Sequence, residues 1–503
     1  MLGAVERLDR DAANGRKGAL GDGRRGRGRD LHPTVIVARS LRGPCAGFTL
    51  YCILMLKASI FREYDIRGIA DEELVDSGII ELGKAIGTYL QRTNGKSITL
   101  GRDCRLSSTR LRNALILGLV ASGCQVTDVG VVPTPLLYYS VFHLKAGGAV
   151  MITGSHNPAE YNGFKVVSGA STIHGDEIQE LRRIIERGDY AQGAGSETSA
   201  DIVTPYVDEI SAQFQFARRV KVVADAGNGT AGPAMHRIFQ KLNCDATELF
   251  FDMNGRFPNH HPDPTVPKNL EQLVAAVKAQ RADLGIAFDG DSDRIGAVDD
   301  KGTVVYGDQL MIIYAREILS RKPGATFIGE VKCSQTLYDD IRAHGGNPIM
   351  WKTGHSLIKA KMKETHADLA GEMSGHMFFA DRYYGFDDAL YAACRLMEIV
   401  SKSGQPLSAQ LAGLPKTVAT PEIRVDCADE RKFEVVKRVA EKFRKTHQTV
   451  DVDGVRILFP HGWGLVRASN TQPVLVLRFE ASTAELLAEY RKEVETAVAQ
   501  AAA

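Results

Sequence analysis

Closely spaced cysteine pairs are missing from this sequence. Its eight cysteines are scattered over the 503 residues, and no two of them are separated by only two positions. A disulfide framework or a zinc site would require tighter groupings of these residues. The pattern therefore argues against both and favours a reduced, cytoplasmic protein.

A strong excess of charge of one sign is also missing. The chain has 62 Lys and Arg against 61 Asp and Glu, so that its formal net charge is +1. This balance argues against nucleic acid or a membrane surface as the main partner. With 44% hydrophobic residues, the chain can bury the cores of two to four domains without disulfides or structural metals.

We expect no membrane anchor in the N-terminal region. Residues 7–42 are rich in Arg and Gly without helical or strand periodicity, and the apolar run that follows at 48–56 is too short to span a bilayer. No A-x-A cleavage site follows that run. We interpret residues 1–57 as a disordered basic leader or an over-extended start, with Met55 as the natural first residue. A genuine basic tail is the alternative, which the N-terminal mass of the native protein would distinguish.

From residue 60 onward, β-branched runs alternate with amphipathic segments, which predicts an α/β protein. Three apolar runs, at 97–100, 220–224 and 326–329, each lead into a polar loop and then a helical stretch. Their spacing, roughly one hundred to one hundred and twenty residues, is that of a typical domain. We predict three related α/β domains and a smaller C-terminal α+β domain, with boundaries at 58–201, 202–303, 304–416 and 417–503.

The segment 151–158 ends an apolar run in a glycine and then presents Ser155 beside His156. Gly154 and Pro158 favour a tight loop there. Such a loop can hold Ser155 exposed and rigid, as a nucleophile or a phosphate carrier requires. Taken alone, the segment is more often an ordinary surface turn.

A second loop carries carboxylates at alternate positions, namely Asp289, Asp291 and Asp293. When the backbone curls, which Gly290 permits, three hard oxygen ligands converge and suit Mg²⁺. The spacing also begins an EF-hand, but Arg294 stands where that motif needs glycine and an apolar strand replaces its leading helix. A metal loop is thus favoured over a plain acidic turn.

Two further polar loops follow. Residues 371–376 contain Glu372 and Ser374, which can bind sugar hydroxyls, and His376, which can act as an acid or a base near neutral pH. Residues 467–473 combine the guanidinium of Arg467 with hydroxyl and amide groups, which is the chemistry of a phosphate-binding loop. Each loop in isolation is about equally consistent with an ordinary surface loop.

Taken in this order, the four loops resemble those of the α-D-phosphohexomutase family. The resemblance covers the chain from about residue 58 to the C-terminus and includes the opening Phe-Arg-Glu-Tyr-Asp-Ile-Arg-Gly at 61–68. It implies four domains around a central cleft, three of them topologically related. It also implies a phosphoserine enzyme that moves phosphate within a hexose phosphate, often as a monomer.

The resemblance also implies roles for individual residues. Ser155 is implied to be the phosphoserine, and Mg²⁺ to be held by Ser155, Asp289, Asp291 and Asp293. The implied catalytic set is Ser155, His376, Lys165, His156 and Arg67. The implied substrate-binding set is Tyr64, Arg294, Lys332, His355, Glu372, Ser374, His376, Arg467, Ser469, Asn470 and Thr471.

The loop sequences favour the branch of the family that acts on glucose and mannose phosphates. Phosphoglucosamine mutases usually carry Gln where this chain has Met373, and Ser-Gly-Thr-Glu-Pro where it has Ser-Asn-Thr-Gln-Pro at 469–473. We therefore expect interconversion of hexose 1-phosphate and hexose 6-phosphate through a 1,6-bisphosphate, with glucose 1,6-bisphosphate as activator. Lys165, His156 and His376 are candidate bases, and we favour His376 for one orientation of the sugar.

Three other functions remain open from the sequence. A phosphoglucosamine mutase would be revealed by its products, and a metal-dependent phosphatase by the release of free phosphate. A non-catalytic sugar-phosphate sensor would have no need for Ser155, the three aspartates and His376 together.

Overall fold

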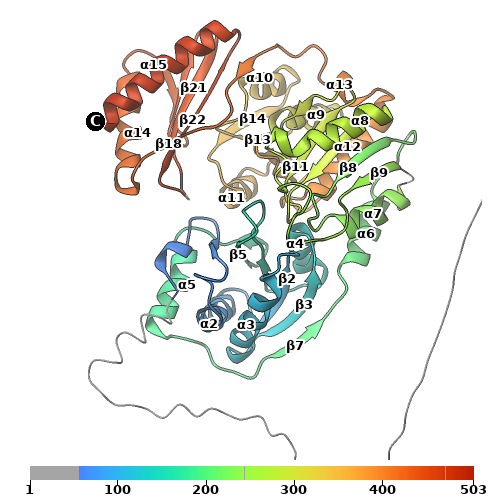
Figure 1. Ribbon diagram of the computed structural model, residues 1–503, viewed down its shortest axis with the longest axis vertical. Coiled ribbons are helices and arrows are strands. Elements are labelled where there is room, and N and C mark those ends of the chain that lie inside the picture. Colours follow the sequence, from blue (N-terminus) through green and yellow to red (C-terminus); the bar gives the residue numbers. More distant parts are fainter. Residues whose placement is uncertain (1–55, 243, 471) are drawn as a thin grey trace, which may run out of the picture. The chain divides into compact units, whose positions relative to one another are not determined.

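A computed structural model describes residues 56–242, 244–470 and 472–503 of the chain (Figure 1). The interpretation of residues 1–55 and the role expected for Thr471 lie outside the described residues. The described part of the chain forms four β-sheets, each with its own helices.

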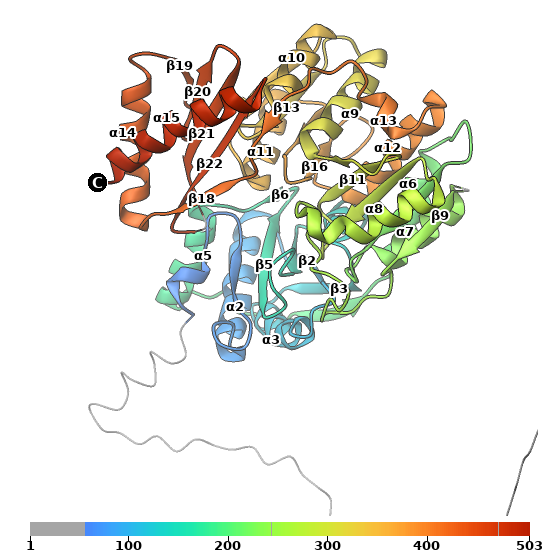
Figure 2. The same cartoon turned by 45° about the horizontal axis from the view of Figure 1, so that its top comes forward.

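The first sheet has seven strands in the order β1-β5-β4-β2-β3-β7, with β6 added to β5. Its strands are β1 (Ile66–Ile69), β2 (Ser97–Arg102), β3 (Gln125–Val131), β4 (Gly148–Ile152), β5 (Tyr161–Ser168), β6 (Ser171–Thr172) and β7 (Ser196–Ser199). The helical segments are η1 (Ala58–Ile60), α2 (Asp76–Thr93), α3 (Ser108–Ala121), α4 (Thr134–His143) and α5 (Asp176–Arg187). Helices α2 and α3 lie side by side (Figures 1 and 2).

The second sheet has five strands in the order β12-β11-β10-β8-β9. They are β8 (Lys221–Asp225), β9 (Asp245–Leu249), β10 (Leu284–Phe288), β11 (Ile295–Asp299) and β12 (Val304–Val305). The helices are α6 (Val203–Ala212), α7 (Gly232–Lys241), η2 (Pro267–Leu270) and α8 (Glu271–Gln280). All five residues of β10 are buried, as expected for a parallel strand covered on both faces.

The third sheet has four strands in the order β14-β13-β15-β16. They are β13 (Thr326–Glu330), β14 (Asn347–Trp351), β15 (Leu369–Gly371) and β16 (Met377–Phe379). The helices are α9 (Gly307–Arg321), α10 (Gln335–Ala343), α11 (His355–Thr365), α12 (Ala389–Ser403) and α13 (Leu407–Gln410).

The fourth sheet is antiparallel and has the order β17-β22-β21-β20-β19, with β18 also paired to β22. Its strands are β17 (Val418–Ala419), β18 (Ile423–Asp426), β19 (Gln448–Val450), β20 (Val455–Phe459), β21 (Gly462–Ala468) and β22 (Val474–Ala481). Both helices, α14 (Asp429–Phe443) and α15 (Ala484–Ala502), pack on the sheet through one apolar core (Figure 1). The expected smaller α+β domain is therefore present.

The first three sheets share one local topology. In each, a central strand (β2, β8 or β13) lies between two parallel neighbours, and one of these neighbours pairs with an antiparallel strand. The corresponding runs are β5-β4-β2-β3, β11-β10-β8-β9 and β16-β15-β13-β14. Strands β2 and β13 contain the apolar runs at 97–100 and 326–329, and β8 contains the run at 220–224 except for its first residue, so the prediction of three related α/β domains is confirmed.

The same topology places three polar loops at equivalent positions. The connection between β4 and β5 carries Ser155, that between β10 and β11 carries the three aspartates, and that between β15 and β16 carries Glu372 and His376. Each loop thus joins a buried parallel strand to its antiparallel neighbour.

Apolar side chains bind the first three domains together more firmly than they bind the fourth. One core cluster includes side chains of α4 from the first domain together with those of the second and third domains. The C-terminal domain has its own core and meets the third domain through a small cluster around Trp463 and Val331. There the buried Arg456 donates to the carbonyls of Val331 and Cys333, each at 2.7 Å, and Arg478 donates to that of Lys332.

Candidate active site

Ser155 lies in the left-handed region of the backbone, with a φ of 48°. A non-glycine residue adopts this conformation at a cost of about 1–3 kcal/mol, so that neighbouring groups must enforce it. Its hydroxyl donates to Oδ2 of Asp289 at 3.0 Å and lies 3.1 Å from Nδ1 of His156. The first and second domains therefore meet at this hydroxyl.

The three aspartates of the second domain converge as the sequence predicts. Asp289, Asp291 and Asp293 are fully buried, and they offer ligand oxygens that all lie within 4.8 Å of one another. Oδ1 of Asp289 accepts the backbone N–H groups of residues 293 and 294, which curls the loop, and Thr134 at the start of α4 donates to Asp291 at 2.6 Å. Such a set of oxygen donors can hold a metal ion.

The electrostatics of this cluster favour added positive charge. Burial and the neighbouring charges of Asp293 and Asp291 raise the pKa of Asp289 well above its usual value. Oδ1 of Asp291 has no hydrogen-bond partner among the described residues, and Oδ1 of Asp293 faces only the ring of His376, at 3.3 Å. The ammonium of Lys165 offsets part of the charge, at 2.9 Å from Asp291 and in contact with Asp293. A divalent cation would supply the remainder, so these residues fit a metal.

His376 connects the third domain to the metal loop. Its Nδ1 lies 2.6 Å from Oε2 of Glu372, and its Nε2 lies 3.3 Å from both Oδ1 of Asp293 and Nε of Arg294. Burial lowers the pKa of His376, but Asp293 and Glu372 outweigh burial and Arg294 and raise it to about 9. Although burial raises the pKa of Glu372, His376 and Lys332 bring it down to about 2.

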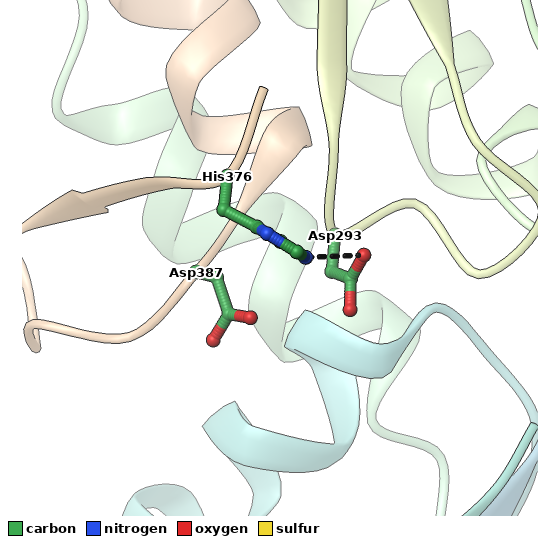
Figure 3. A group of neighbouring side chains, drawn as sticks. All are labelled: Asp293, His376 and Asp387. Carbon is green, nitrogen blue, oxygen red and sulfur yellow. Dashed lines mark ion pairs between the residues drawn. The ribbon is translucent and has the colours of Figure 1, made fainter. Parts of the chain in front are cut away.

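Figure 3 shows a second group of potential ligands formed by Asp293, His376 and Asp387. Two cations of the protein already lie beside these potential ligands, because Lys359 contacts Asp387 at 3.0 Å and Nε of Arg294 lies 3.3 Å from Nε2 of His376. We therefore assign no metal to it.

The remaining expected catalytic residues, His156 and Arg67, lie in and beside the Ser155 loop. Burial, together with the charges of Arg294 and Arg67, lowers the pKa of His156 well below its usual value, which keeps its imidazole neutral. Arg67, on β1, donates to the side chain of Asn157 at 2.8 Å and pairs with Asp65. These contacts place a neutral imidazole beside the hydroxyl and a guanidinium against Asn157 of the same loop.

Apart from Tyr64 and Arg294, the residues expected to bind substrate belong to the third and fourth domains. Lys332 contacts Glu422 at 2.7 Å and Glu330 at 3.4 Å. Arg467 donates through Nε to Oδ2 of Asp453 at 2.9 Å. These cations are thus already paired with carboxylates of the protein.

Tyr64 joins three of the domains. Its hydroxyl donates to the carbonyl of Thr353 at 3.0 Å and accepts from Asn470 at 2.6 Å, while the backbone N–H of Thr353 donates to Asp453 at 3.1 Å. Burial raises the pKa of Tyr64 to about 12. His355 lies at the start of α11, with its ring centroid 6.1 Å from that of Tyr64.

The hydroxyls of Ser374 and Ser469, which are also expected to bind substrate, contact neighbouring residues of their own loops. Ser374 lies 3.4 Å from both Oε2 of Glu372 and Nδ1 of His376. Ser469 accepts from the backbone N–H of Gln472 at 3.2 Å.

Sequence reasoning missed several residues that organise the site. Arg105 and Asp103 lie beneath the Ser155 loop, and Asp453, Glu422 and Thr353 contact the expected substrate-binding residues. The one signal for the first two is their place in the polar loop 101–105, directly after a buried strand. Asp453, Glu422 and Thr353 belong to no recognisable motif, because they contact residues that are distant in the sequence.

The four domains, with one polar loop at the same topological position in each of the first three, define the α-D-phosphohexomutase fold. Models of the phosphoglucomutase/phosphomannomutase alpha/beta/alpha domains I, II and III match residues 58–192, 204–302 and 306–418, and that of the C-terminal domain matches 422–497. The chain belongs to the phosphoglucomutase/phosphomannomutase family.

Individual relatives agree with this assignment. A phosphomannomutase/phosphoglucomutase of Pseudomonas aeruginosa is 48% identical over 433 residues, which are 86% of this chain and 94% of the relative. A phosphoglucomutase of Neisseria gonorrhoeae is 45% identical over 429 residues, or 84% of this chain and 93% of that one. A crystal structure of a family protein from Burkholderia thailandensis has a TM-score of 0.84 at 44% identity and covers 89% of this chain and 98% of that one. The family resemblance read from the sequence is thus confirmed.

Within the parts of the chain that the structure describes, no helix has the length and apolar character needed to cross a membrane.

Proposed function

We propose that this protein interconverts the 1-phosphates and 6-phosphates of glucose and mannose through a phosphorylated Ser155 and a hexose 1,6-bisphosphate. The observation that carries the proposal is the position of the Ser155 hydroxyl, 3.0 Å from Asp289 within a buried group of three aspartates. The names of the curated relatives support the same substrates.

In the first step, phospho-Ser155 transfers its phosphoryl group to the free hydroxyl of a hexose 1-phosphate. The bond between phosphorus and Oγ breaks and a bond from phosphorus to the sugar oxygen forms. The sugar hydroxyl gives its proton to a base of the protein, and the released Oγ of Ser155 takes up a proton to restore the serine hydroxyl. The bisphosphate then turns over, and Ser155 accepts the other phosphoryl group, which leaves hexose 6-phosphate. Transfer of this kind depends chiefly on alignment and on neutralisation of charge.

We assign Mg²⁺ to Asp289, Asp291, Asp293 and Ser155, because hard carboxylate oxygens are the ligands this ion prefers. When bound, the ion would offset the negative charge of the transferring phosphoryl group. Lys165, Arg294 and Arg67 add positive charge from the protein around the same hydroxyl. His376 is the proposed acid or base for one orientation of the sugar.

The proposed roles of the substrate-binding residues follow from the two orientations in which the sugar phosphate must bind. Arg467, Ser469, Asn470 and Thr471 are proposed to hold the phosphate that is not reacting, whichever end of the sugar carries it. Glu372 and Ser374 are proposed to bind the 3- and 4-hydroxyls, assisted by Tyr64, Lys332 and His355. Since glucose and mannose differ only at C2, a site that binds these hydroxyls accepts both sugars.

The test is ³¹P NMR of the protein with Mg²⁺, a trace of glucose 1,6-bisphosphate, and either glucose 1-phosphate or mannose 1-phosphate. We expect both 6-phosphates to appear without free phosphate. Conversion of one sugar alone would narrow the specificity, and release of free phosphate would indicate a phosphatase. Without the bisphosphate we expect a lag, because Ser155 that has lost its phosphate must first be phosphorylated again.

A further inference from the structure

We propose that Arg105 is a positioning residue that holds Ser155 in line for phosphoryl transfer. The proposal rests on the function of Ser155 as phosphate carrier. It concerns a side chain that lies under the loop, on the side away from the reacting hydroxyl.

The guanidinium of Arg105 donates to four backbone carbonyls of the Ser155 loop. One terminal nitrogen contacts the carbonyls of Ser155 at 2.7 Å and Asn157 at 2.6 Å. The other contacts those of Pro158 and of Tyr161, the latter at 3.1 Å. Because the donors of a guanidinium lie in one rigid plane, they fix the relative positions of these carbonyls.

Asp103 completes the arrangement. Its Oδ2 lies 3.2 Å from Nε of Arg105 and also accepts the backbone N–H of Gly154 at 3.0 Å. Its Oδ1 accepts the hydroxyl of Ser108 and the backbone N–H of Arg105. The side chains of the pair are 0% and 2% exposed, so this is a buried ion pair with many hydrogen bonds, which is the form in which buried charge is tolerated.

The loop has little room to move between this pair and the second domain. A Cβ on Gly154 would lie 2.4 Å from Nε of Arg105, and a Cβ on Gly290 would lie 2.6 Å from the carbonyl oxygen of Ser155. Ser155 itself has a φ of 48°, which a serine in an unrestrained loop rarely adopts. The contacts of Arg105 therefore account for a conformation that the local sequence does not favour.

This placement matters because Ser155 must both give and accept phosphate. An error of about 1 Å in the position of a reacting group can reduce the rate by about 10²-fold. A loosened loop would also let water reach the phosphoserine in place of a sugar hydroxyl. Lysine at position 105 would keep the charge, but its compact ammonium could not span four carbonyls.

The test compares Arg105→Lys and Asp103→Asn with a matched control, Arg395→Lys. Arg395 is also fully buried and paired with two carboxylates, Glu317 at 2.7 Å and Asp381 at 3.0 Å, in the third domain. Each protein is phosphorylated with glucose 1,6-bisphosphate and Mg²⁺ and freed of sugar. The phosphorylated fraction is then followed with time by intact mass, and kcat and KM are measured in parallel.

For Arg105→Lys we expect kcat to fall about 10²-fold with KM within about threefold, and the phosphoserine to hydrolyse at least about tenfold faster than in the wild type. Arg395→Lys should match the wild type in phosphoserine lifetime even if its melting temperature falls. If the wild type takes no phosphate on Ser155, the proposed function is wrong. If the wild type is phosphorylated and Arg105→Lys behaves like the control, the positioning role is wrong.

Should Arg105→Lys not fold, as judged by circular dichroism, Asp103→Asn decides the question. This variant keeps the size of the side chain and removes the charge that orients Arg105. A shortened phosphoserine lifetime supports the proposal, and a wild-type lifetime overturns it.

Discussion

The two ends of the site are built differently. Around Ser155, groups from the first three domains are buried in direct contact with one another, and these domains share one apolar core. In the C-terminal domain, Arg467 is paired with Asp453, and Glu422, just before β18, is paired with Lys332. That domain has a core of its own.

The two ends of the site are thus suited to two different physical tasks. Transfer of a phosphoryl group requires fixed geometry, which a dense, continuous core provides. Recognition of a sugar that must bind in two orientations requires cations that can exchange one anionic partner for another. On the proposed function, the carboxylates at the second end would keep these buried cations paired until a phosphate took their place.

The largest effect is expected at the rigid end. Asp289→Asn should lower kcat by at least about 10³-fold, because it removes both a proposed metal ligand and the hydrogen-bond acceptor of Ser155. Steady-state assays at saturating Mg²⁺ measure this. The control is Asp299→Asn, a buried aspartate of the same domain that accepts from its own turn, for which we expect a change within about twofold. Near-normal kcat in Asp289→Asn would contradict the metal assignment.

Next in size is His376→Ala, for which we expect kcat to fall by about 10²–10⁴-fold if the imidazole acts as acid or base. The exposed His344, in the same domain, gives a control when replaced by alanine. A loss of less than about tenfold in His376→Ala would leave the histidine without an acid–base role. The role of His376 would then be to position the side chains of Glu372 and Arg294.

A smaller effect is expected for Asp453→Asn. Loss of the carboxylate that orients Arg467 should raise KM for both sugar phosphates by about tenfold and leave kcat within about threefold, because the chemistry takes place at the other end. An equal fall in kcat would show that the two ends are coupled more tightly than we propose.

The smallest effect is expected for Glu422→Gln, and in the opposite direction. If Lys332 binds substrate as proposed, Glu422 competes for the same ammonium, so neutralisation of Glu422 should lower KM by about two- to fivefold. Lys332 lowers the pKa of Glu422 to about 2, so the carboxylate stays charged at any working pH. The change in KM should therefore be the same at about pH 6 and about pH 8. A rise in KM would mean that Glu422 orients Lys332 instead.

Local patterns in the sequence predicted much of this site. The apolar runs at 97–100, 220–224 and 326–329 predicted the three central strands, and the loops that bear Ser155, Asp289 and His376 were identified by residue type and glycine content. These features could be found because a buried strand and the turn after it are encoded by adjacent residues. The roles of the individual residues in those loops remain predictions.

The partners of these residues could not be found in the same way. Arg105 binds carbonyls about fifty residues away, and Asp453 contacts a backbone N–H of another domain. In the sequence neither residue can be told from a charged residue at the surface, since each becomes a buried partner only when the chain folds and brings distant segments together. The acceptors that Arg105 contacts in the Ser155 loop are backbone carbonyls. Because every residue has a backbone carbonyl, the sequence does not show which of them a buried arginine will bind.

The equivalent loops of the first three domains have a final consequence. The scaffold repeats one topology three times, yet the proposed function gives each copy a separate role: one would carry the phosphoryl group, one would bring carboxylate oxygens together, and one would bind the sugar. On that function no copy can substitute for another, so a defect in a single loop would abolish activity. A symmetric homo-oligomer must repeat the same residues at each position, whereas a single chain with internal repeats can make them different.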